Sequence, residues 1–258
     1  MTADLALPER MLMLGGDPSL VRYEYLHVIR ATIAAHPRSA QKAIGPSEIG
    51  TPCQRRLGYR LAGVPQVQAG GSWRPTVGTA VHSWLDMAFA DPRWNDAEGT
   101  ARWLTETKVD VGEIAGIPIT GRADLYDRIT GTSIDHKCVG ITTLRAARAG
   151  RVDPKYRVQG HLYGRGWARA GLPIETVAIS YLPNNGELNE AHWWSEPYDE
   201  AIAVGALEAA NTVAVLLKVV PAAMLLPVLA TANDHCNWCP WFMPAATDLT
   251  EACPGHRP

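Results

Sequence analysis

The stretch GRADLYDRITGTSIDHK, residues 121–137, decides how the rest of the chain is interpreted. Its two halves, 121–127 and 133–138, predict short β-strands, and Gly131 supplies the backbone freedom that a turn between them needs. The stretch is therefore expected to form a β-hairpin within a larger sheet.

Three charged side chains lie on this predicted hairpin. Asp124 falls on its first strand, and Asp135 and Lys137 fall on its second. Because side chains alternate along a strand, Asp135 and Lys137 should point to one face and His136 to the other. Two carboxylates held together are destabilising unless a cation neutralises them, so they can hold a divalent metal for phosphodiester hydrolysis. A solvated hairpin with a surface ion pair is the alternative interpretation.

The composition is that of a soluble folded chain. Its 258 residues are 47% hydrophobic and 19% charged, enough for one large domain or two small ones. The net charge of −2 excludes a global basic field for nucleic acid. The longest apolar run, 213–232, is broken by Lys218, Pro221 and Pro227, which predicts a core helix ending near Pro221 and not a membrane span. No secretory signal pattern opens the sequence, so the five cysteines favour metal ligation over disulfides.

Helices and strands are expected on both sides of the hairpin. Apolar spacing and start signals predict helices at 19–37, from Cys53 to about 61, at 77–91, from Asp153 to about 170, and at 198–220. Strands are predicted at 104–111, 117–126, 175–182 and 188–194, and a Gly- and Pro-rich linker at 62–75. This order predicts an α/β fold around a mixed sheet.

A local basic surface follows the hairpin. The segment 142–171 carries seven lysines and arginines against one acid, Asp153, and interleaves them with aromatic residues, as nucleic-acid-binding surfaces do. The predicted DNA contacts are Arg145, Arg148, Arg151 and Arg157 here, and Arg55 and Arg56 on the earlier helix. For the arginines of the earlier helix, a solvated helix face is the alternative.

Four motifs occur in a fixed order on the expected elements: His82, Asp124, Asp135-His136-Lys137 and Gln159-x-x-x-Tyr163. This ordered set resembles the PD-(D/E)xK nuclease superfamily, specifically its RecB-like branch, over roughly 77–182. The resemblance implies a restriction-endonuclease-like core, in which a central mixed β-sheet is flanked by helices. It also implies a metal-dependent deoxyribonuclease, an exonuclease that acts on single-stranded DNA or DNA ends in recombination, repair or CRISPR-type adaptation.

Two groups of residues receive roles from the resemblance. The ligands of Mg²⁺ or Mn²⁺ would be His82, Asp124, Asp135 and the backbone carbonyl of His136. The catalytic set would be Asp124, Asp135, Lys137, Gln159 and Tyr163. Within it, Lys137 would orient the attacking water and stabilise developing charge, and the two helix residues would position DNA or the water network. For His82, a hydrogen-bonded structural histidine is the alternative.

A second acidic motif, Glu-x-Lys at 106–108, also falls on a predicted strand, with Asp91 upstream. Asp91 is expected to close a helix, so no strand bearing an acid precedes this motif. The later pair of aspartates is therefore preferred, and Glu106 is interpreted as an accessory polar residue.

The cysteines form a separate pattern. Cys236 and Cys239 form a C-x-x-C motif, with Cys253 behind it and Cys53 far upstream. The pattern resembles the split four-cysteine set of iron–sulfur RecB-like nucleases, which include the CRISPR-associated exonucleases, and implies a [4Fe–4S] cluster. Structural Zn²⁺ is the alternative metal. Because the gap before Cys253 is long, His235 or His256 could replace it as the fourth ligand.

A single nuclease domain over 1–258 is expected, with its core at about 77–195. A helical segment at 1–61 and a C-terminal segment at 198–258 would meet at the cysteines. DNA is the expected partner, alone or with other DNA-processing proteins and without a membrane, in the cytoplasm of a prokaryotic cell or a phage-infected host. A non-cutting DNA-end-binding or assembly subunit and a zinc-stapled endonuclease stay open. No G-x-x-x-x-G-K-[ST] segment occurs, which excludes a built-in ATP-driven motor.

Overall fold

A computed structural model describes residues 18–35, 44–67, 73–232 and 236–256. The chain divides into two compact units, 1–41 with 70–72, and 42–69 with 73–258. The first unit contributes one described helix, α1 (Pro18–Ala35), close to the predicted 19–37. Its predicted stop at Pro37 lies outside the described residues. The second unit contains all the elements that follow.

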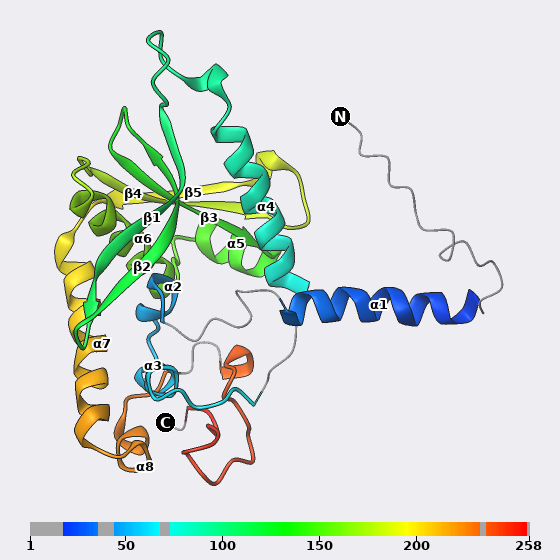
Figure 1. The fold of residues 1–258 in the computed structure, drawn as a ribbon, viewed down its shortest axis with the longest axis vertical. Helices are drawn as coiled ribbons and strands as arrows, with labels where there is room; N and C mark the ends of the chain where they lie inside the picture. The colour runs from blue at the N-terminus through cyan, green and yellow to red at the C-terminus, as the bar shows by residue number, and fades with distance from the viewer. Residues whose placement is uncertain (1–17, 36–43, 68–72, 233–235, 257–258) are drawn as a thin grey trace, which may run out of the picture. The chain divides into compact units, whose positions relative to one another are not determined.

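A five-stranded mixed sheet forms the centre of the second unit (Figure 1). Its strands, in spatial order, are β1 (Trp103–Ile114), β2 (Ile117–Asp127), β3 (Thr132–Val139), β4 (Thr176–Pro183) and β5 (His192–Pro197). The β3–β4 pair is parallel and the other pairs are antiparallel. The predicted hairpin is confirmed as β2–β3, with Leu125 opposite Ile134. Gly131 takes the left-handed backbone that the turn requires, with φ of 61°.

Two helices form the crossover that the parallel pair β3–β4 needs. They are α5 (Ile141–Arg148), which was not predicted, and α6 (Pro154–Arg169), which was. Asp153 caps α6 by accepting a hydrogen bond from the Lys155 backbone N–H at 2.9 Å. The helix lies close to the sheet at Gly166, where a Cβ would come within 2.5 Å of Val109 Cγ2.

Helices α4 (Trp73–Phe89) and α7 (Glu200–Val219) lie on opposite flanks of the sheet (Figure 1). The predicted start of α4 at residue 77 is wrong, because α4 begins within the predicted linker 62–75. Pro75 does not prevent this, since the first turn of a helix tolerates proline. Of the helices that the structure describes, α7 is long and apolar enough to cross a membrane. Its buried side chains are Ala203, Leu207, Ala210 and Val213, as expected of the predicted core helix.

The strand predicted at 188–194 starts later, at His192. The residues before it form a 3-10 turn, η3 (Leu188–Glu190), because Glu187 and Glu190 cap each other's backbone in a capping box. A further 3-10 turn, η2 (Pro92–Trp94), follows α4 and is capped by Asp91.

A second, smaller core joins early and late segments of the chain. It is formed by residues of α3 (Gln54–Leu61), α8 (Ala222–Leu225) and η4 (Leu226–Val228) together with Trp241 and Cys253, which follow η5 (Cys236–Trp238). Helix α2 (Pro46–Ile49) instead packs Ile49 into the main core. The Tyr59 ring stacks on Trp241, with centroids 5.6 Å apart. Its hydroxyl donates to the carbonyls of Leu249 and Ala252 at 2.7 and 2.9 Å. These contacts place α3 beside the C-terminal segment (Figure 1).

Candidate active site

Two buried carboxylates lie on the adjacent strands β2 and β3. Asp124 is 8% exposed and Asp135 is 2% exposed. The backbone N–H of His136 donates to Asp124 Oδ2 at 2.7 Å, so the neighbouring strand fixes this carboxylate. Lys137 Nζ lies 2.5 Å from Asp135 Oδ2, on the same face of β3 as the alternation predicts.

The ammonium of Lys137 is held from several directions. It donates to Gln159 Oε1 on α6 at 3.0 Å. It also lies 4.8 Å from the centroid of the Tyr156 ring, within cation–π range. The predicted helix motif therefore contacts the site through Gln159, which positions the lysine.

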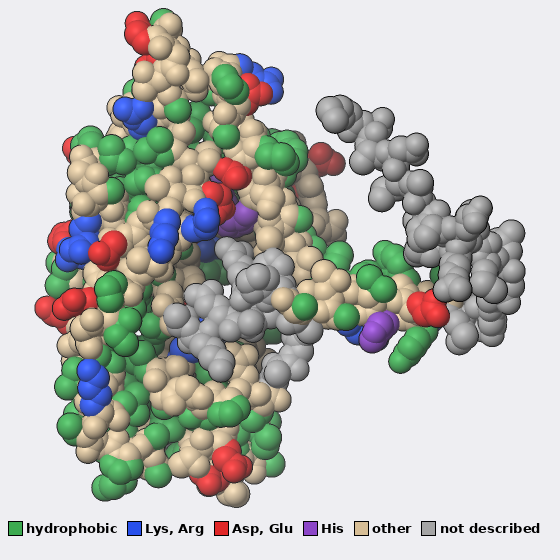
Figure 2. Space-filling view, viewed as in Figure 1, with side chains coloured by type: hydrophobic (Ala, Val, Ile, Leu, Met, Phe, Trp, Pro, Cys, Tyr) green, Lys and Arg blue, Asp and Glu red, His purple; other side chains and the backbone are tan. Residues whose placement is uncertain are grey.

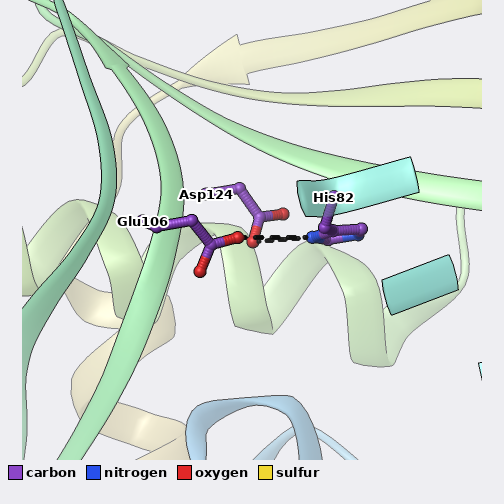
Figure 3. A group of neighbouring side chains, drawn as sticks. All are labelled: His82, Glu106 and Asp124. Carbon is purple, nitrogen blue, oxygen red and sulfur yellow. Dashed lines mark ion pairs between the residues drawn. The ribbon is translucent and has the colours of Figure 1, made fainter. Parts of the chain in front are cut away.

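His82 comes to the carboxylates from α4. Its Nδ1 lies 3.3 Å from Asp124 Oδ1 and 3.7 Å from Glu106 Oε1. Figure 3 shows the imidazole pointing at both carboxylates. In the space-filling view, acidic side chains and a histidine lie together near α4, with basic side chains beside them (Figure 2).

Glu106, interpreted from the sequence as an accessory polar residue, lies beside His82 and Asp124. Its carboxylate, the imidazole of His82 and the carboxylate of Asp124 offer ligand atoms within 4.8 Å of one another. Thr105 pairs with Leu125 and Thr107 with Ala123, so Glu106 and Asp124 fall between the same two pairs of the β1–β2 ladder. Its φ of 41° is in the left-handed region, which costs a residue with a Cβ about 1–2 kcal/mol. The sequence signal for this position was the Glu-x-Lys motif at 106–108, which was not preferred over the later pair of aspartates.

The charges of the site depend strongly on one another. Burial raises the pKa of Asp135 to about 6, although the Lys137 ammonium opposes this shift. Burial opposes the charged form of Lys137, but Asp135 and Asp124 raise its pKa. Burial likewise opposes protonation of His82, but Asp124 and Glu106 raise its pKa to about 10. The carboxylates thus favour nearby positive charge, which protonated His82 and Lys137 supply in the protein without a metal.

The donor atoms fit a hard divalent cation. Apart from the ion pair with Lys137, neither oxygen of buried Asp135 has a hydrogen-bond partner among the described residues. His82 Nδ1 also lacks one apart from its ion pairs. Carboxylate oxygens with one imidazole suit Mg²⁺ or Mn²⁺. The structure groups His82 and Asp124 with Glu106, and Asp135 with Lys137, so the predicted four-ligand set stays a prediction.

Two predicted residues take positions that the motif did not specify. His136 packs its buried ring between His82, in an edge-to-face contact, and Phe89, in a stacked one, with centroids 6.0 Å apart in both. Its contact with the site runs through its N–H, and the metal-binding role of its carbonyl stays a prediction. Tyr163 is 7% exposed in the main core. It packs at Gly121, where a Cβ would lie 3.0 Å from Tyr163 Cε1.

The six predicted DNA-contacting arginines divide into four groups, one of which is Arg56 alone, in the lining of the cysteine cavity. Arg145 and Arg151 are exposed on and after α5. Arg148 donates to the Glu190 carbonyl, and Arg157 pairs with Glu196 at 2.6 Å. Arg55 donates to the carbonyls of Leu226 and Pro227, both at 2.9 Å, which gives it a structural position between α3 and η4.

The four predicted cysteine ligands share one cavity of about 40 Å³: Cys53, Cys236, Cys239 and Cys253. Backbone N–H groups point at two of the sulfurs, from Arg56 to Cys53 at 3.5 Å and from Gly255 to Cys253 at 3.4 Å. His256 also lines the cavity, and its Nδ1 lies 2.8 Å from Thr231 Oγ1. His235 lies outside the described residues.

Among the described residues, no three cysteine sulfurs lie within 4.8 Å of one another. In a tetrahedral zinc site, with Zn–S bonds of about 2.3 Å, the sulfurs are about 3.8 Å apart.

No protein-family model and no curated protein matches this chain. Several solved structures are similar to it. SSO0001 is 20% identical, over 78% of this chain and 84% of that one, with a TM-score of 0.47. An alkaline exonuclease (LHK-Exo) from Laribacter hongkongensis is 12% identical, over 69% and 88%, with a TM-score of 0.44. A phage-related exonuclease from Haemophilus somnus is 14% identical, over 66% and 78%, with a TM-score of 0.43.

Proposed function

We propose that this chain is a divalent-metal-dependent deoxyribonuclease of the RecB-like PD-(D/E)xK type, an exonuclease acting on single-stranded DNA or DNA ends. One observation carries the proposal. Among the described residues, buried Asp135 has no hydrogen-bond partner besides its ion pair with Lys137, a lysine that Gln159 and the Tyr156 ring hold in place. A cation site next to a fixed ammonium is what phosphodiester hydrolysis requires.

The metal would be held by the carboxylates of Asp124 and Asp135. His82 from α4 and Glu106 from β1 would be further ligands. When bound, Mg²⁺ or Mn²⁺ lowers the pKa of a coordinated water and neutralises charge on the scissile phosphate. The Lys137 ammonium has three N–H donors, of which two face Asp135 and Gln159. The third can donate to the attacking water or to a phosphate oxygen, where it stabilises developing negative charge.

Hydrolysis explains this arrangement better than DNA binding alone does. Buried like charges and a strained backbone at Glu106 both destabilise the metal-free fold. Such features concentrate at catalytic centres, where ligands must be held in place before the substrate arrives. A non-cutting DNA-end-binding subunit gains nothing from them.

The test is DNA cleavage by Asp135→Asn and Lys137→Met in Mn²⁺, on end-labelled single and double strands. Each variant should lose at least about a hundredfold in rate, the usual cost of removing one group that stabilises the transition state. Asp127→Asn, a buried carboxylate on the same hairpin that contacts Arg102, is the matched control and should still cut. If both site variants cut as well as the unchanged protein, the site is wrong. Binding without cleavage in every metal would favour the non-cutting subunit, and cleavage of closed single-stranded circles would favour an endonuclease.

We also propose a [4Fe–4S] cluster in the cysteine cavity. Four cysteines that line one cavity support the proposal, as do backbone N–H groups directed at two of the sulfurs, because hydrogen bonds to sulfur tune such clusters. Anaerobically purified protein should be brown and contain iron and acid-labile sulfide. Colourless protein with zinc and no iron would exclude the cluster and favour the zinc alternative.

A further inference from the structure

Two positively charged side chains line the cysteine cavity. Besides the sulfurs, its charged lining residues among those described are Arg56, Lys155 and a single acid, Asp153. Arg56 lies on α3, one turn after Cys53, and Lys155 lies in the first turn of α6. Asp153 already accepts the hydrogen bond that caps α6. The cations therefore outnumber the acids around a cavity of thiols.

Within the part of the chain that the structure describes, neither cation forms an ion pair with a carboxylate. Arg60, on the same helix as Arg56, does pair with Glu48. Burial lowers the pKa of Lys155, and Arg56 and Lys137 lower it further. The weaker effects of Asp153 and Glu48 do not reverse this. A half-buried lysine beside other cations keeps its charge more easily when an anion balances it.

A metal centre held by four thiolates is such an anion. Four thiolate charges around Zn²⁺ or an oxidised [4Fe–4S]²⁺ core leave a net charge of about −2. We propose that Arg56 and Lys155 are the counter-ions of an anionic tetrathiolate metal centre in this cavity. The inference rests on the proposed cysteine-held centre and is independent of the acidic site.

For an iron–sulfur centre, the counter-ions would set the reduction potential. One-electron reduction by an external low-potential donor adds a negative charge to the cluster, and nearby positive charge favours that step. Replacing a cation by a neutral side chain should therefore make reduction harder. For a zinc centre, which undergoes no reduction, the same cations would instead raise the affinity for the metal.

The experiment uses the full chain, purified anaerobically, with Lys155→Met and Arg56→Met. A dithionite titration followed by electron paramagnetic resonance should show reduction about tenfold less favourable in each variant, which is about 59 mV for one electron. Lys155→Arg keeps the charge and should stay near the unchanged protein. Lys218→Met, a charge removed from the last turn of α7, outside the cavity lining, is the matched control and should leave the potential unchanged.

Every outcome decides the proposal. Equal potentials in all variants would overturn it, and equal potentials with weaker DNA binding in Lys155→Met and Arg56→Met would assign these cations to DNA phosphates. If the protein contains zinc, faster zinc loss to a chelator in the same two variants supports the proposal, and unchanged loss overturns it. An unchanged protein that holds no metal on its cysteines overturns both the centre and its counter-ions, and DNA cleavage then tests the nuclease proposal separately.

Discussion

The acidic site and the cysteine cavity are the two places where we propose a metal, and the fold assembles them differently. The acidic site takes its carboxylates from three strands that are neighbours in both sequence and space, β1, β2 and β3. The cavity takes its sulfurs from the start of α3, from η5 and from the C-terminal segment. Helix α6 connects them, because Lys155 lines the cavity and Gln159, about one turn later, holds Lys137.

The two regions are expected to differ in how far their structure depends on a bound metal. Ladder hydrogen bonds and the main core position the carboxylates whether or not a metal is bound. The sulfurs are held by a small core around Tyr59 and Trp241, so a metal there would contribute directly to folding. We therefore expect metal removal to abolish activity at the acidic site and to cost stability at the cavity.

The largest expected effect is the loss of the cavity's metal. Cys236→Ser with Cys239→Ser should remove the metal and lower the free energy of unfolding by several kcal/mol, about 5 or more, because metal binding and folding are coupled. Denaturant unfolding of anaerobic protein measures it. Cys138→Ser, a half-buried cysteine on β3 outside the cavity, is the control and should cost about 1 kcal/mol. Equal unfolding midpoints for the double variant and the control would show that the cavity needs no metal.

Glu106 allows the acidic site to be weakened without weakening the fold. Glu106→Gln and Glu106→Asn should both lower Mn²⁺-dependent cleavage about 10- to 100-fold, the effect typical of a residue that supports metal ligands. Asn adopts the left-handed backbone more easily than Gln, so Glu106→Asn should be the more stable variant by about 0.5–1 kcal/mol.

Cleavage rates and thermal unfolding of the two Glu106 variants are measured side by side. Unchanged cleavage in both would return Glu106 to an accessory polar role. Equal stability would mean that its backbone is not strained.

Asp127, three residues after Asp124 on the same strand, serves the fold instead of the site. It is 3% exposed and accepts hydrogen bonds from Arg102 Nε at 2.9 Å and Thr130 Oγ1 at 2.8 Å. Burial opposes its ionisation, but Arg102 and Thr130 hold its pKa below the usual range. A lowered pKa stabilises the fold above the unfolded value of about 3.9 and loses that contribution as pH falls through the folded value.

Asp127→Asn should therefore cost about 2 kcal/mol near neutral pH and less at about pH 3, which is below the unfolded pKa. Urea unfolding at the two pH values tests this, and Asp124→Asn is the comparison that should lose cleavage. A pH-independent cost for Asp127→Asn would mean that its charge is irrelevant to stability.

The sequence predicts best where local rules decide the structure. Strand alternation placed Asp135 and Lys137 on one face, and Asp153 with Pro154 fixed the start of α6. The position of Glu106 beside Asp124 was not predicted, because it depends on cross-strand register and on a left-handed backbone that a strand pattern does not reveal. The structural position of Arg55 was not predicted, because its partners, the carbonyls of Leu226 and Pro227, are distant in sequence.

The smallest expected effect separates binding arginines from structural ones. Arg145→Gln with Arg151→Gln should weaken single-stranded DNA binding about 3- to 10-fold and lower the salt slope by about 1.4, since each lost phosphate contact removes about 0.7. Arg55→Gln, which removes a single guanidinium charge, should keep the slope and lose about 1 kcal/mol of stability through its two carbonyl bonds. Binding measured across salt concentrations distinguishes them. A reduced slope for Arg55→Gln with an unchanged slope for the double variant would move the DNA path from α5 to α3, toward the cysteine cavity.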